Sequence, residues 1–237
     1  MDDEPRRSLQ REGVSFFGAV GAGLSHELSN VLNIINELSG LQQDIVAAAG
    51  DGGSAGLARV ADLAARVKSQ AIRGEEINRS LHRLSHTVDD PDVSFDLGDA
   101  LALFESLAAR AARLAEVELE VRPPEGPLAH RGDPFALQMV LHACLRAALA
   151  AAASGRRIEV WAEGGGNAAR VIMSSADPVP GLESDASIAA ALKLGGAVLG
   201  AMPRLEPGVG AGHRIVLELA DGPAGNGAGS DDGAVEV

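Results

Sequence analysis

The stretch Ser25-His26-Glu27-Leu28-Ser29-Asn30 opens a long apolar heptad and decides how the first third of the chain folds. The apolar residues recur at alternating steps of four and three, which is the spacing of a helix in a bundle. On such a helix His26 lies between two seam leucines and faces solvent, and Asn30 and Asn33 follow on its face one and two turns later. The seam consists of Phe17, Leu24, Leu28, Val31, Ile35, Leu38 and Ile45.

This helix has a partner immediately after it. The charged segment 1–12 is either frayed or helical. The pattern then predicts helices over about 14–49 and about 55–87, joined by a glycine-rich turn at 50–54. Two long amphipathic helices with a short connection form an antiparallel hairpin. A single hairpin leaves much apolar surface in water, so we expect a second copy of the chain to complete a homodimeric four-helix bundle.

A mixed pattern begins after the helix-breaking segment 89–92. It predicts an α/β sandwich, with helices on one face of a mostly antiparallel sheet, so the whole chain is α+β. The domains are a hairpin at 12–89, the sandwich at 92–220 and a disordered acidic tail at 221–237. The expected strands are 93–97, 117–121, 157–163, 169–173 and 214–219, and the expected helices are 100–114, 134–153 and 188–194.

Composition excludes several classes of function. The 237 residues carry a formal net charge of −13, which argues against binding to nucleic acid or to an anionic membrane and suits protein partners. The single cysteine, Cys144, rules out an intramolecular disulfide and a cysteine zinc site, and its apolar surroundings predict a buried small side chain. We see no signal peptide and no apolar run of about 18 residues, so we expect a cytoplasmic protein.

Two motifs carry a resemblance to a known family. Ser-His-Glu-Leu-x-Asn before an apolar heptad resembles the phosphoacceptor box of bacterial histidine kinases, and the order of elements over 12–220 resembles their core, a phosphotransfer hairpin followed by a nucleotide-binding domain. The segment from Asp133 is similar to the family's Asp-x-x-x-Leu-x-x-Val-Leu-x-Asn-Leu-x-x-Asn-Ala helix. His142 and Arg146 stand where that family has its two asparagines.

These departures predict a degenerate ATP site. The family's second asparagine helps to hold magnesium, which prefers oxygen ligands, whereas Arg146 offers a positive charge and no acceptor oxygen. Asp177 matches the aspartate that reads adenine in the family's Asp-x-Gly-x-Gly-Ile loop, but Val179 replaces the first glycine. The segment 182–188 is too short and lacks the glycines that cradle phosphates. We therefore interpret Asp177 as a structural loop residue.

A chain that has an intact histidine box and a degenerate ATP site resembles the dimeric histidine phosphotransferases of the ChpT type in bacterial phosphorelays. The resemblance implies that His26 carries the phosphoryl group, because a neutral imidazole is a good nucleophile at cytoplasmic pH. Glu27 either accepts a hydrogen bond from the second ring nitrogen or is a solvated surface acid, and Asn30 contacts the phosphoryl group or the partner. A response-regulator receiver domain supplies the acceptor aspartate and Mg²⁺, and a hybrid histidine kinase lies upstream. The chain needs no metal or ATP of its own.

Two rival functions stay open at this point. One is an active soluble histidine kinase with a divergent ATP site, and the other is a pseudokinase that regulates a partner by docking alone. His82 and His86 have the i, i+4 spacing of a zinc site, but no further ligand completes it, so we interpret them as a solvated helix end.

Overall fold

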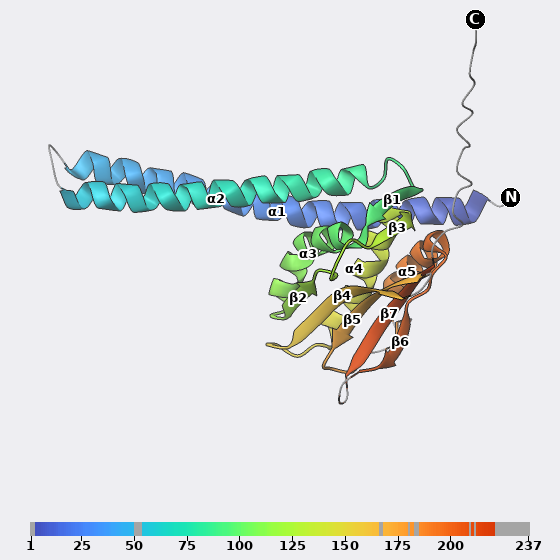
Figure 1. The fold of residues 1–237 in the computed structure, drawn as a ribbon. Coiled ribbons are helices and arrows are strands. Elements are labelled where there is room, and N and C mark those ends of the chain that lie inside the picture. The colour runs from blue at the N-terminus through green and yellow to red at the C-terminus, as the bar shows by residue number, and fades with distance from the viewer. Residues whose placement is uncertain are drawn as a thin grey trace, which may run out of the picture.

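The computed structural model describes residues 3–49, 54–165, 168–179, 181–182, 185–208, 210 and 212–220. It contains a long antiparallel hairpin of α1 (Asp3–Ala49) and α2 (Ser54–His86), followed by a domain of helices and strands (Figure 1). The predicted α+β class is therefore confirmed. The predicted tail at 221–237 lies outside the described residues.

The hairpin is held by the predicted seam. Leu24, Val31 and Leu38 of α1 are at most 5% exposed. Gly74 of α2 lets the two helices approach closely, because a Cβ atom there would lie 3.3 Å from Val31 Cγ1. The buried side chains of α2 are Leu63, Ile77 and Leu84.

Of the two alternatives for the charged N-terminal segment, the structure shows the helical one. The helix begins at Asp3 and not near residue 14. Its early turns extend beyond the end of α2 and lie along the C-terminal domain, where the rings of Phe16 and Phe135 are 5.4 Å apart. Because this support comes from a distant part of the chain, the heptad pattern alone does not reveal it.

The C-terminal domain is built on a five-stranded sheet in the order β2-β4-β5-β7-β6. Only the β2–β4 pair is parallel, so the prediction of a mostly antiparallel sheet is confirmed. A separate two-stranded sheet pairs β1 with β3. The strands are β1 (Val93–Asp96), β2 (Glu118–Arg122), β3 (Ala129–Gly132), β4 (Arg157–Gly165), β5 (Ala168–Ser175), β6 (Arg204–Pro207) and β7 (His213–Ala220).

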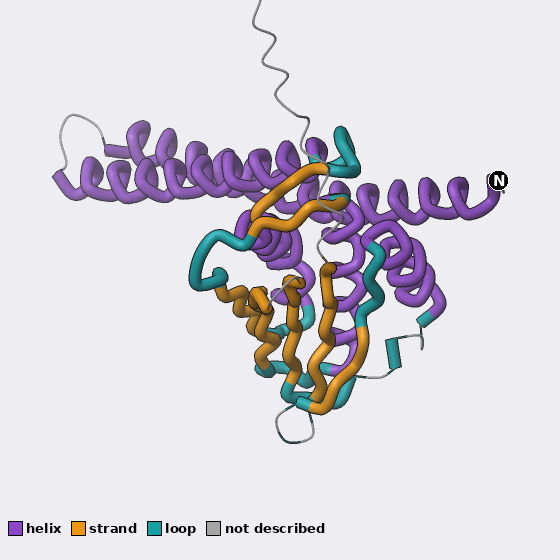
Figure 2. Tube along the Cα trace, turned by 45° about the vertical axis from the view of Figure 1, so that its right-hand side comes forward, coloured by secondary structure: helices purple, strands orange, loops and turns teal. Residues whose placement is uncertain are grey.

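Three helices cover one face of this sheet, namely α3 (Leu97–Leu114), α4 (Pro134–Ala151) and α5 (Ala186–Leu199) (Figure 2). Asp96, Asp133 and Asp185 cap them, each accepting a hydrogen bond from a backbone N–H of the first turn. α4 is the only described helix long and apolar enough to span a membrane, and most of it is buried in the core. Helix α5 packs tightly on it, since a Cβ at Gly195 would lie 2.6 Å from Val140 Cγ2.

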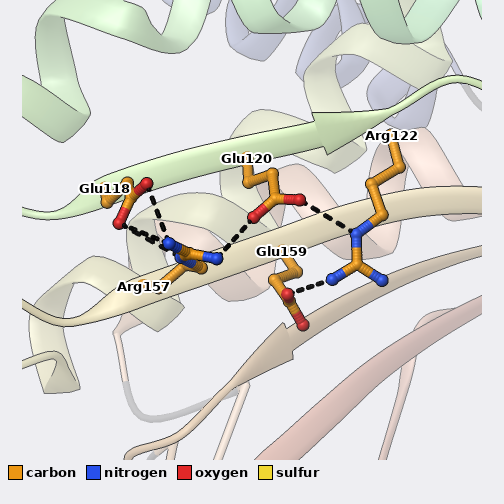
Figure 3. A network of polar contacts seen from close by, with 5 residues as sticks. All are labelled: Glu118, Glu120, Arg122, Arg157 and Glu159. Atoms are coloured by element: carbon orange, nitrogen blue, oxygen red, sulfur yellow. Dashed lines mark hydrogen bonds and ion pairs between the residues drawn. The ribbon is translucent and has the colours of Figure 1, made fainter.

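The other face of the sheet carries a network of ion pairs (Figure 3). Arg157 pairs with Glu118 at 3.1 Å and with Glu120 at 2.9 Å, and Arg122 bridges Glu120 and Glu159. These residues belong to adjacent strands, β2 and β4. The network pairs three carboxylates with two guanidinium groups, so most of its charge is neutralised locally.

Candidate functional site

His26 lies on the surface of α1, as its position between buried seam residues predicts. Its side chain is exposed, and so are those of Asn30 and Asn33 on the same face. No described residue forms a hydrogen bond with the imidazole. The ring is therefore open to a visiting molecule.

Glu27 has neither of the two environments predicted for it. Its side chain is only 11% exposed and accepts a hydrogen bond from the guanidinium of Arg113 in α3. Arg73 Nη2 of α2 lies 3.8 Å from the other carboxylate oxygen. The residue after His26 therefore connects three helices and joins the hairpin to the C-terminal domain. Neither arginine could be predicted from the sequence: Arg113 is 86 residues away from Glu27, and no local pattern relates either arginine to it.

The connection between Glu27 and Arg113 can be measured with a double-mutant cycle. We expect Glu27→Gln and Arg113→Gln to show a coupling of about 0.5–1 kcal/mol in the free energy of unfolding, because the arginine is half exposed and solvent weakens the pair. The four proteins are compared by urea unfolding. The coupling should shrink in high salt, and a zero coupling at low salt would show that the two residues do not interact.

His142 and Arg146, which stand where the resembled family has asparagines, both lie on α4. His142 Nδ1 donates to the carbonyl oxygen of Gln138 at 2.8 Å, and its ring packs against Phe16 and Phe104. Burial lowers the pKa of His142 to about 4, so its imidazole is neutral. Arg146 donates to the hydroxyl of Ser187 at 2.8 Å. Neither side chain has an oxygen atom for magnesium.

The side chain of Asp177 is engaged in contacts within the protein. Its carboxylate accepts a hydrogen bond from the N–H of Ala153 at 3.0 Å and lies 3.6 Å from Arg156 Nε. It is 16% exposed, and its own N–H donates to the hydroxyl of Ser175. These contacts agree with our interpretation of Asp177 as a loop residue. The residues present do not fit a magnesium nucleotide at this place.

We expect Asp177→Ala to lower stability without changing chemistry at His26. The substitution removes the hydrogen bond from the exposed N–H of Ala153, and the net loss of such a bond costs about 0.5–1.5 kcal/mol. Unfolding monitored by the fluorescence of Trp161, the only tryptophan, would measure this loss. The matched control is Asp44→Ala, an exposed aspartate on α1 with no hydrogen-bond or ion-pair partner among the described residues, and an equal effect of both variants would contradict the structural role.

His82, His86 and Cys144 make no candidate site in the part of the chain that the structure describes. His82 and His86 are exposed with their rings 4.4 Å apart, and His86 Nδ1 lies 2.6 Å from Asp89, as expected for a solvated helix end. Within the described ranges, no three His, Cys, Asp or Glu residues form a group that could hold a metal. Cys144 is 2% exposed, and burial raises the pKa of its thiol to about 12, so the thiol stays protonated.

No protein-family model and no curated protein matches the chain. Solved structures similar to it include histidine kinase ThkA in complex with response regulator protein TrrA, at 16% identity over 93% of this chain and 66% of that chain, with a TM-score of 0.48. A bacterial phosphotransferase is 16% identical over 85% of this chain and 95% of that chain, with a TM-score of 0.48. Histidine kinase AdeS of Acinetobacter baumannii is 14% identical over 82% and 97%, with a TM-score of 0.46. Likenesses this distant assign no function.

Proposed function

We propose that this chain is a histidine phosphotransferase, which passes a phosphoryl group between His26 and receiver-domain aspartates of a bacterial phosphorelay without binding ATP. The observation that carries the proposal is the exposed imidazole of His26, which has no hydrogen-bond partner among the described residues and lies within a phosphoacceptor-like box on a packed helix. The contacts of Arg146 and Asp177 support the absence of ATP chemistry, because both side chains are engaged within the protein.

The reaction needs little from the chain besides a positioned nucleophile. The lone pair of one ring nitrogen attacks the phosphorus atom of a receiver phosphoaspartate. A P–N bond forms as the P–O bond to the aspartate breaks, and the carboxylate leaves with the electron pair. The proton on the other ring nitrogen then passes to solvent. The receiver domain supplies the magnesium that neutralises the phosphoryl oxygens, and Asn30 lies on the face that the receiver meets.

The proposed partners follow from the exposed surfaces of the hairpin. Large apolar side chains are exposed on both of its helices, and pairing with a second copy in a four-helix bundle would cover them. The net charge of −13 suits a cytoplasmic protein that meets receiver domains and not nucleic acid or membranes. The hairpin's exposed apolar residues include Leu32, Leu41, Val46, Leu57 and Ile72.

The experiment mixes the purified protein with a receiver domain carrying labelled phosphoaspartate. We expect acid-labile phosphate to appear on the chain, and no label when the protein is incubated with labelled ATP and magnesium. Labelling of His26 from ATP alone would identify an active kinase. A protein that binds the receiver but never acquires phosphate would be a docking module.

A further inference from the structure

A cavity of about 360 Å³ lies between the hairpin and the C-terminal domain. Helix α1 forms one wall between Glu12 and Glu27, and α3, α4 and α5 form the others. Its volume is in the range of small-molecule sites in proteins. The walls are mostly apolar, and their larger apolar side chains include Phe16, Val20, Leu24, Leu107, Leu114 and Met139.

Arg110 of α3 lines this cavity and carries a positive charge. Its side chain lies beside α1, where a Cβ atom on Gly23 would be 3.8 Å from Arg110 Cδ. In the part of the chain that the structure describes, its guanidinium has no hydrogen-bond or ion-pair partner. A guanidinium facing an apolar cavity without a partner is a ready binding group for an anion.

The other charged groups of the lining leave Arg110 free. Glu27 is bound by Arg113 and Arg73. Glu12 lies near the far end of the cavity, about 16 Å from Gly23 along the axis of α1. Arg146 is hydrogen-bonded to Ser187. The cavity therefore has mostly apolar walls, and the side chain of Arg110, which has no partner among the described residues, lies near Gly23.

We propose that this cavity binds a small amphipathic carboxylate, with its apolar body between α1 and α3–α4 and its carboxylate on Arg110. Burial of the apolar body drives binding, and the fork of the guanidinium fixes the head group through paired hydrogen bonds. A nucleotide is a poor match, because its base and phosphates need many polar partners that apolar walls lack. The bound molecule would contact Gly23 and Leu24, in the turn of α1 just before His26.

The test is isothermal titration calorimetry of the full chain with dodecanoate below its micelle concentration. We expect saturable binding, and Arg110→Gln should weaken it by at least about tenfold. Ala19→Phe should also abolish binding, because Ala19 lines the cavity and a phenyl ring there fills it while Arg110 remains. The matched control is Arg79→Gln, an exposed arginine on α2 outside the cavity, which should bind like the wild type.

Before titration, circular dichroism and the unfolding midpoint of each variant are compared with those of the wild type to check that the variant is folded. Equal affinities for dodecanoate and the neutral 1-dodecanol would overturn the proposal, as would unchanged binding in Arg110→Gln. Tighter binding of magnesium-ATP than of dodecanoate would overturn it too. The dodecanoate, 1-dodecanol and Arg110→Gln measurements do not involve phosphoryl transfer or ATP, so their failure leaves the proposed function standing. Tight binding of magnesium-ATP would in addition contradict the part of the proposed function that excludes ATP.

Discussion

Replacing His26 with alanine is expected to reduce phosphoryl transfer from a phosphorylated receiver domain by at least about 10³-fold, because the substitution removes the nucleophile itself. The side chain is exposed and has no hydrogen-bond partner among the described residues, so the fold should be unaffected. The transfer is followed as acid-labile label on the chain after rapid mixing. Circular dichroism and the unfolding midpoint should match those of the wild type.

His82→Ala is the matched control, since His82 is also an exposed histidine on a hairpin helix. It should transfer phosphate at the wild-type rate. If His26→Ala keeps its effect on a downstream receiver while carrying no phosphate, the chain acts by docking. If both histidine variants transfer normally, another residue carries the group and the proposed function is wrong.

The second large effect is on stability. Phe104 of α3 is 0% exposed and packs edge-on against the ring of His142, 5.0 Å away between centroids. We expect Phe104→Ala to cost about 3–5 kcal/mol of unfolding free energy, because it removes a large buried side chain and leaves a void. Denaturant unfolding followed by Trp161 fluorescence would report this loss, since Trp161 belongs to β4 of the same domain.

Leu114→Ala gives the comparison within the same helix. Leu114 is 69% exposed, so its truncation should change stability by no more than about 0.5 kcal/mol. The contrast between the two variants tests whether the buried face of α3 supports the domain. Equal losses would mean that Phe104 is not in a packed core.

Much of the fold could be predicted because its signals are local. The heptad seam sets the hairpin and turns His26 outward, and Asp133 followed by Pro134 marks the start of α4. Strands β3 (Ala129–Gly132) and β6 (Arg204–Pro207) were not predicted, because both segments are short and lack an alternation of apolar residues. Their extended shape depends on pairing with β1 and β7, which no local pattern encodes.

The sequence by itself determined the α+β class and the exposed histidine on its helix, because hydrophobic periodicity and helix capping depend on residues that are close together in the chain. Only the tertiary structure decided that Glu27 lies between two arginines, that α1 runs over α4 and α5, and that Arg110 faces an apolar cavity. These features join residues far apart in the chain, and their contacts form only when the hairpin packs on the C-terminal domain.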